Sequence, residues 1–264
     1  MNDSAILRIS IWDDPRLRAF GEALRSDSTE VSFDSREAGE KRLSAGLVDI
    51  ALLATDIAVG LSEDFDILPA VAYSSWSTPH ATINLKDGFE SRPEVLECAD
   101  PKALESLVSK VVLQEHYGIS VRPEAASSPA NVSAGSAVLA FDVPGPTNDG
   151  RNLDLGQEWY ELTNYPMVWG LFAMRKGELD AGVIRHLRNA AASVESADHL
   201  DGTDPGDDGM GLPRFRFDDI VTASLTELCR YLYFYGVTGD IREIEPAKVP
   251  ESADIGEDKR DPML

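Results

Sequence analysis

Hydrophobic and polar residues alternate with two different periods over the first third of the chain. Residues 5–12 alternate as a strand does, and residues 13–26 place Leu17, Phe20 and Leu24 at helical spacing behind a Pro-led start. Strands and helices that alternate with short links predict a parallel sheet in a doubly wound α/β lobe. The expected strands here are 5–12, 29–35, 47–55, 64–75 and 80–86, and the expected helices are 13–26 and 36–46.

The pattern changes after residue 86 and indicates a second lobe. An amphipathic helix is expected over 101–119, and a last helix over 217–237 carries Val221, Leu225 and Leu228 on one face. The remaining expected segments are a loop over 120–136, a strand over 137–145, a helix over 178–196 and an acidic, Gly-rich loop over 197–214.

We expect an α/β fold of two lobes with a ligand cleft between them, because the chain builds one lobe, crosses to a second and returns. The crossings are predicted near 84–92 and 165–175. Lobe I then comprises 1–85 and 175–245, and lobe II comprises 86–174. Residues 246–264 have no apolar period, which predicts a disordered tail.

The charge of the chain narrows the classes of partner. Its 264 residues include 46 acidic and 24 basic side chains, for a net charge of −22. Phosphate backbones and anionic lipid surfaces repel such a chain, so we expect neither nucleic acid nor a membrane as a partner. A small anionic ligand stays compatible with this charge, because one arginine or helix N-terminus outweighs the distant charges at short range.

Cysteine and histidine positions predict no metal and no cofactor. Cys98 and Cys229 form no CxxC pair, and His116, His186 and His199 lack metal-ligand spacing. The acidic loop lacks the residue order of an EF-hand. The amino end shows no signal-peptide pattern, and no apolar run approaches eighteen residues. We therefore expect a cytoplasmic protein.

One stretch, "LDLGQEWYELTNYPMVWGLF" at 153–172, resembles the signature of a menaquinone-biosynthesis family that contains chorismate dehydratase and dihydroxynaphthoate synthase. Segments 43–56, 107–119 and 215–237 are similar to other parts of that family. The resemblance implies a two-lobed, type-II periplasmic-binding-protein fold without secretion. The signature residues are Asp154, Leu155, Gly156, Trp159, Thr163, Pro166, Val168 and Phe172.

The sequence departs from that family where its ligand-binding residues are expected. The family has an Asn just after the first strand, and here "WDDPRLRAF" has Arg16 near that place. The family's Ser-x-Thr-Ser turn, which binds substrate carboxylate, is replaced by "ADPKALES", with Asp100, Pro101 and Glu105. Its Gly-Asp after a buried strand becomes Phe141-Asp142.

Arginine and hydroxyl side chains near strand ends are candidate ligand-binding residues. Arg16, beside Trp12, would clamp a carboxylate, because the guanidinium fork matches it; the alternative is a solvated helix face. Thr55 would donate a hydrogen bond into the cleft or cap the next helix. The stretch 73–80 offers Ser77 as pocket wall and His80 as an acid or base, or forms an ordinary loop.

The second crossing supplies the remaining candidates. Thr163, Asn164, Tyr165 and Trp169 would line the pocket at the hinge, or pack the hinge itself, because aromatic residues also dominate cores.

Two functions are open at this point. The resemblance implies a carbon–oxygen lyase that removes water from chorismate in the futalosine route to menaquinone. Such an elimination needs a base, an acid for the leaving hydroxyl and a clamp for two carboxylates. In the alternative, the chain is a catalytically degenerate paralogue that binds a small carboxylated or aromatic ligand without turnover.

Overall fold

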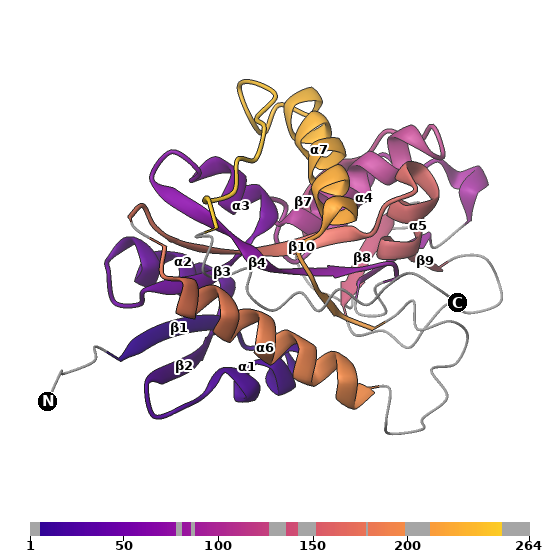
Figure 1. The fold of residues 1–264 in the computed structure, drawn as a ribbon. Helices are drawn as coiled ribbons and strands as arrows, with labels where there is room; N and C mark the ends of the chain where they lie inside the picture. Colours follow the sequence, from indigo (N-terminus) through magenta and orange to yellow (C-terminus); the bar gives the residue numbers. More distant parts are fainter. Residues whose placement is uncertain are drawn as a thin grey trace, which may run out of the picture.

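The computed structural model describes residues 6–77, 81–85, 88–126, 136–141, 152–177, 179–198 and 212–249, and it shows two α/β lobes, each built on its own sheet (Figure 1). Among these residues, no helix combines the length and the apolar character that crossing a bilayer requires.

Lobe I contains a six-stranded sheet in the order β11-β4-β10-β3-β1-β2. The predicted βαβαβ order is confirmed, and β1 pairs in parallel with β2 and β3, whereas β10 runs antiparallel between β3 and β4. Its strands are β1 Leu7–Trp12, β2 Thr29–Asp34, β3 Ile50–Ala54, β4 Phe65–Ser75, β10 Met167–Arg175 and β11 Arg214–Phe215. Its helices are η1 Pro15–Leu17, α1 Arg18–Leu24, α2 Arg36–Ser44, α3 Thr55–Gly60, α6 Ala181–Asp198 and α7 Asp219–Phe234.

Lobe II contains a five-stranded sheet in the order β7-β6-β8-β5-β9. The prediction of a loop over 120–136 is wrong at its start, because β7 pairs with β6 there; Pro123 is tolerated because β7 is an edge strand. The strands are β5 Ala81–Leu85, β6 Val95–Cys98, β7 Arg122–Ala125, β8 Ala137–Phe141 and β9 Asn152–Asp154. The helices are η2 Phe89–Ser91, α4 Leu104–Glu115 and α5 Leu155–Thr163.

The chain changes sheet between β4 and β5 and again between α5 and β10, so the two crossings follow Ser75 and Thr163. β5 belongs to the second sheet and β10 to the first, so the boundaries predicted at 85/86 and 174/175 move by one strand each. The physical reason is that β10 and β4 pair with each other in lobe I. The chain therefore leaves lobe I and re-enters it through two adjacent antiparallel strands, which form the hinge.

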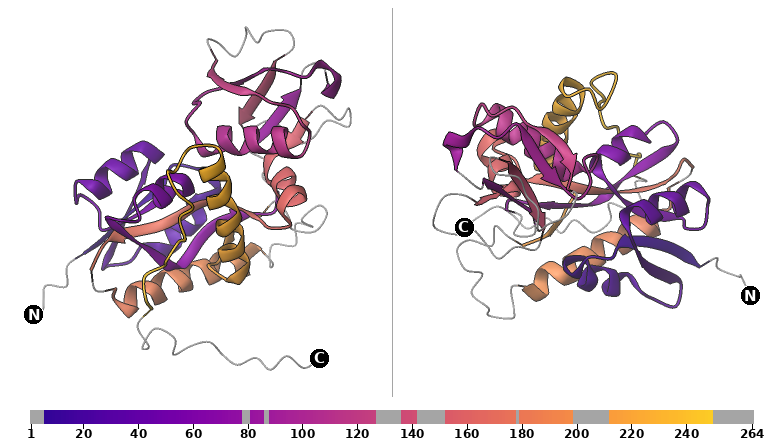
Figure 2. Two further views of the ribbon diagram at one scale, coloured as in Figure 1. Left: turned by 90° about the horizontal axis from the view of Figure 1, so that it is seen from above. Right: turned by 180° about the vertical axis from the view of Figure 1, so that it is seen from behind.

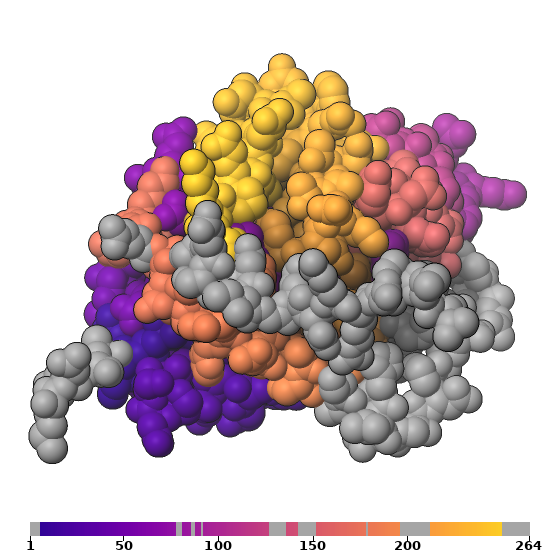
Figure 3. Space-filling model, in the orientation of Figure 1, coloured from indigo at the N-terminus to yellow at the C-terminus, as the bar shows by residue number. Residues whose placement is uncertain are grey.

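Helix α7 contacts both lobes: it lies between them in the view from above (Figure 2, left) and at the top of the molecule in Figure 3. Ser224 Oγ donates to the carbonyl of Pro166 in the second crossing, at 2.5 Å. On the lobe II side, the ring of Tyr231 meets Trp159 of α5 edge-on at 5.6 Å, and Tyr235 Oη donates to Glu115 of α4 at 2.8 Å. Motion of one lobe against the other is therefore restrained at α7.

The segment after α7 leads into the tail that the sequence predicts to be disordered, and two of its residues contact the folded part of the chain. Ala247 N donates to the carbonyl of Ile67 in β4 at 2.9 Å, and Val249 packs against the core. Residues 250–264 lie outside the described residues.

Gly170 lets β10 pass beneath Trp12, which forms part of the site described below. A Cβ at this position would lie 2.8 Å from Trp12 Cη2 and 3.0 Å from both Leu52 Cδ1 and the Leu53 carbonyl oxygen. Because the backbone carbonyl cannot move aside, we expect Gly170→Ala to lower the free energy of unfolding by about 1–3 kcal/mol. Urea denaturation measures this change. Gly60→Ala, where a Cβ would meet nothing within 4 Å, is the matched control and should change stability by less than about 1 kcal/mol.

Candidate functional site

A polar cluster lies where the carboxyl ends of β1, β2 and β3 meet the beginning of α4. The carboxyl ends of parallel strands share one edge of a sheet, so residues that follow these strands gather there. The cluster joins both lobes, since six of its residues come from lobe I and Glu105 comes from lobe II. We call it the interlobe cluster, and its members are Trp12, Asp14, Arg16, Arg36, Asp56, Tyr73 and Glu105.

Arg36 and Glu105 form a two-pronged ion pair between the lobes. Nη1 of Arg36 lies 2.8 Å from Oε2 of Glu105, and Nη2 lies 2.6 Å from Oε1. The Glu105 side chain is 0% exposed. Burial lowers the pKa of Arg36, but the charge and hydrogen bonds of Glu105 more than offset this and raise it above its usual value. Arg36 is therefore charged, and its pair with Glu105 closes the interlobe cluster from the side of lobe II.

The aromatic ring of Trp12 holds the Arg36 guanidinium in place. The guanidinium carbon lies 4.2 Å from the centre of the Trp12 ring, a cation–π distance. Tyr73 meets the same indole edge-on at 5.9 Å. Burial and the charge of Asp14 raise the pKa of Tyr73 to about 12, although Arg16 and Arg36 act in the opposite direction. Tyr73 is therefore a protonated donor at neutral pH.

Arg16 is the second arginine of the interlobe cluster. Its Nη2 lies 2.5 Å from Oδ2 of Asp14, and its backbone N–H donates to Oδ1 of the same carboxylate at 2.9 Å. Asp14 thereby caps η1 and orients the guanidinium with one side chain. Each of the two arginines is thus matched to a carboxylate of the chain itself.

Asp56, at the start of α3, is a buried acid of the cluster whose pKa is raised. Burial, and after it the charge of Glu105, raise its pKa to about 6, against backbone hydrogen bonds and Arg36 that lower it. Its buried Oδ1 has no hydrogen-bond partner among the described residues, and the same holds for the indole Nε1 of Trp12. An acceptor and a donor in one buried cluster are groups that a bound molecule could satisfy.

Two of the residues predicted to bind ligand lie in this cluster, namely Trp12 and Arg16. Thr55 instead donates its hydroxyl to the Val168 carbonyl at 2.7 Å and ties α3 to β10. Trp169 is fully buried, and its Nε1 donates to Ser75 Oγ at 2.8 Å, so its indole belongs to the core.

The candidates at the second crossing shape the hinge. Thr163 Oγ1 donates to the Trp159 carbonyl at 2.8 Å, and exposed Asn164 ends α5 in the left-handed conformation, with φ of 63°. Tyr165 and Ser77 are partly buried beside the two crossings. His80 lies outside the described residues, so its role as an acid or base stays a prediction.

Arg36, Asp56 and Tyr73 were missing from the predicted ligand-binding residues. A signal for them was available, since Asp56 ends the buried run of β3 and Arg36 follows the Ser35 cap directly after β2. The rule that ligands bind near the carboxyl ends of parallel strands would have selected both. In the sequence, Glu105 stands out only because it departs from the family pattern.

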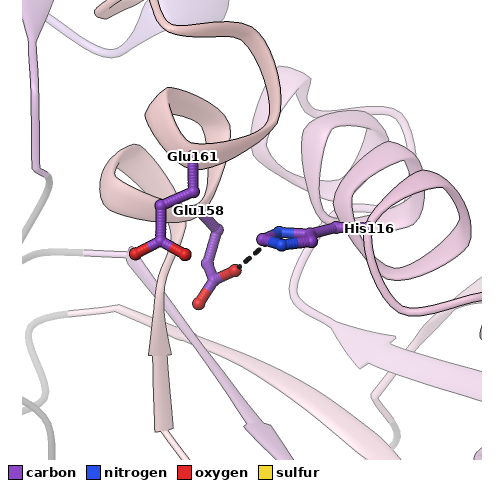
Figure 4. Close-up of side chains that lie close together, drawn as sticks. All are labelled: His116, Glu158 and Glu161. Carbon is purple, nitrogen blue, oxygen red and sulfur yellow. Dashed lines mark ion pairs between the residues drawn. The ribbon is translucent and has the colours of Figure 1, made fainter.

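His116, Glu158 and Glu161 form a second polar group, between α4 and α5 (Figure 4). Their ligand atoms lie within 4.8 Å of one another, so these described residues could hold a metal ion. The pKa of Glu158 is raised by burial. However, Glu158 Oε2 already accepts from Tyr117 Oη at 2.7 Å and lies 3.3 Å from His116 Nδ1. Because these groups satisfy one another, we assign them to the packing of α4 on α5.

A pocket with a volume of about 690 Å³ lies at the opposite end of β1 from the interlobe cluster. Its lining includes Arg8, Thr29, Asp49 and His186. Arg8 and Asp49 form an ion pair, with Arg8 Nη2 2.8 Å from Asp49 Oδ1. His186 Nε2 forms a hydrogen bond with the Leu24 carbonyl. The pocket lies at the amino end of the strands, so we place the candidate site at the interlobe cluster instead.

Comparison with known proteins identifies a family over most of the chain. Residues 7–201 match the family model described as menaquinone biosynthesis. None of the curated proteins gives a significant sequence match.

Solved structures share the two-lobed fold at low sequence identity. Protein AF1704 from Archaeoglobus fulgidus is 15% identical with a TM-score of 0.58, and the match covers 90% of this chain and 100% of that one. The aliphatic sulphonate-binding protein SsuA from Escherichia coli is 10% identical with a TM-score of 0.56, covering 93% and 94%. SsuA from Xanthomonas axonopodis pv. citri, solved with bound MOPS, is 15% identical with a TM-score of 0.53, covering 91% and 96%. The predicted fold class, a two-lobed periplasmic-binding-protein-like fold, is confirmed.

Proposed function

The chain belongs to the menaquinone-biosynthesis family, and from that premise we propose that it binds a small carboxylated molecule between its lobes and dehydrates it. The proposed substrate is chorismate, as the sequence resemblance implies. The observation that carries the proposal is the interlobe cluster, which sets two arginines beside a buried aspartate whose pKa is about 6. The structural relatives that are described as sulfonate-binding proteins support a small anionic ligand.

The two arginines would provide the clamp. Chorismate carries two carboxylates, and a guanidinium fork binds a carboxylate through two parallel hydrogen bonds. Arg16 and Arg36 both lower the pKa of Tyr73, so both guanidinium charges lie near its hydroxyl. Trp12, which packs under Arg36, would present its Nε1 donor to the ligand.

Asp56 would move the proton. A general base works best when its pKa lies near the working pH, and burial raises the pKa of Asp56 to about 6. In the proposed elimination, Asp56 takes the carbon-bound proton, the carbon–oxygen bond breaks and the electron pair forms the new double bond. The same proton then passes from Asp56 to the leaving hydroxyl, so water departs and the carboxylate is restored. Neutral Tyr73 would support the leaving oxygen with a hydrogen bond.

One observation favours the alternative function, in which the ligand is bound without turnover. Both arginines already have carboxylate partners in the chain, Asp14 and Glu105. The cluster is therefore less positive than two free arginines would make it, which weakens its pull on a dianion.

The test is to incubate the purified protein with chorismate, to follow the mixture by chromatography and to record thermal shifts in parallel. Loss of chorismate with appearance of its dehydrated enolpyruvyl product supports the lyase. A thermal shift without product supports the binding protein. If neither the product nor a thermal shift is observed, chorismate is rejected as the ligand of both the lyase and the binding protein.

Substitution of Arg16 tests the clamp. We expect Arg16→Ala to weaken binding of the carboxylate ligand by about 1.5–3 kcal/mol, because a charge-assisted hydrogen bond is lost. Isothermal titration measures the change. Arg18→Ala is the matched control, since Arg18 pairs with exposed Asp13 on the same segment and should leave affinity unchanged. Equal affinities for the wild type and Arg16→Ala would remove Arg16 from the site.

A further inference from the structure

We propose that Glu105 is an internal competitor for the carboxylate of the ligand at Arg36, and that exchange of the two carboxylates sets both the affinity of the site and the opening of the lobes. This inference rests on the proposed function, in that the interlobe cluster takes a carboxylated ligand.

The geometry of the pair is the first reason. Both oxygens of Glu105 face both terminal nitrogens of Arg36, at 2.6 and 2.8 Å. This is the arrangement that a guanidinium uses to bind a carboxylate of any origin. Trp12 lies over the plane of the guanidinium and fixes its direction. A ligand carboxylate can therefore use this face of Arg36 only after Glu105 has left it.

The origin of the two partners is the second reason. Arg36 begins α2 in lobe I, and Glu105 lies in the first turn of α4 in lobe II, 69 residues further along the chain. Separating the pair therefore separates the lobes on this side of the molecule. The contacts of α7 with Pro166, Trp159 and Glu115 do not involve the pair, so they can persist while it opens.

The burial of Glu105 is the third reason. Losing the ion pair with Arg36 is costly for a carboxylate that is 0% exposed, so engagement of Arg36 by a ligand favours movement of Glu105 out of its place. The nearby carboxyl of Asp56 adds to this cost, because the two acids disfavour each other's charge. Glu105 must then gain access to water, which the opening of the lobes provides. Exchange and opening are thus one event.

Glu105→Gln tests the exchange, because glutamine keeps the shape of the side chain and removes its charge. With chorismate and benzoate as probes, we expect titration calorimetry to give a dissociation constant at least about tenfold lower than that of the wild type. This factor corresponds to one charge-assisted hydrogen bond for which the ligand no longer competes with Glu105. Small-angle scattering of the same variant should show a larger radius of gyration. Arg36→Lys, which loses the fork, should bind both probes more weakly than the wild type.

Asp49→Asn is the matched control, since Asp49 pairs with Arg8 in the same two-pronged way but within lobe I, and it should change neither readout. If the wild type binds chorismate and Glu105→Gln binds it no tighter, the exchange is wrong while the proposed function stands. If none of the variants binds either probe, the proposed function fails and the exchange fails with it. If the radius of gyration of Glu105→Gln equals that of the wild type, the proposal that the exchange opens the lobes is wrong.

Discussion

Replacing Arg36 with methionine should lower the free energy of unfolding by about 3–5 kcal/mol, the range found when one partner of a buried ion pair is removed. Glu105 would stay fully buried and lose its ion pair with Arg36. The charge of Glu105 raises the pKa of Asp56 and the charge of Arg36 lowers it, so the substitution also removes the charge that offsets the repulsion between the two acids. Methionine replaces much of the apolar stem of arginine, so the loss reports on the charge more than on the packing.

Urea denaturation at pH 7.5 measures this loss, and two further variants make the measurement decisive. Arg36→Met combined with Glu105→Leu should regain most of the stability, because an apolar pair needs no compensation. Arg8→Met breaks the partly exposed pair with Asp49 and should cost less than about 1 kcal/mol. A loss below about 1 kcal/mol for Arg36→Met would show that the lobes are not held by this pair.

The elements of lobe I up to β4, apart from the short helix α3, could be predicted because their hydrophobic periods are long and agree with their turn chemistry. The cap of η1 by Asp14 and the run of five buried residues in β3 are visible in the sequence. The short strands β6, β7 and β9 could not be predicted in the same way. Each has three or four residues, too few to establish a period, and it is held by its neighbour in the sheet rather than by its own pattern.

In the candidate site, too, residues marked by local sequence could be predicted, whereas contacts between distant segments could not. Trp12 and Arg16 could be predicted because Trp12 ends a recognisable strand and Arg16 lies four residues beyond it. The partner of Arg36 could not be predicted, since Glu105 reaches it from the other lobe and no local pattern connects them. The pKa of Asp56 likewise depends on burial between distant segments. The sequence did carry one trace of this arrangement, because the acidic "ADPKALES" stands where the family binds a substrate carboxylate.

Asp56→Asn should raise stability and lower activity together. The pKa of Asp56 is raised from 3.8 to about 6 in the folded protein. Between these two values the folded state keeps the proton and the unfolded state loses it, so the free energy of unfolding falls as the pH rises from about 4 to about 6 and is level above. Asparagine removes this penalty. We expect the variant to be more stable than the wild type by about 2–3 kcal/mol at pH 7.5 and equal to it near pH 4.

The same substitution removes the proposed base, so turnover of chorismate should fall at least about 100-fold, the usual contribution of a positioned acid or base. Asp64→Asn, at an exposed turn of the same lobe, is the control and should change neither quantity. Denaturation curves from pH 4 to 8 and chromatographic assays on one preparation give both results. A variant that is more stable but equally active would keep Asp56 as a strained buried acid and move the base elsewhere. A variant that is less stable at pH 7.5 would mean that the charged carboxylate supports the fold, and Asp56 would then be a partner of Arg36 rather than a proton carrier.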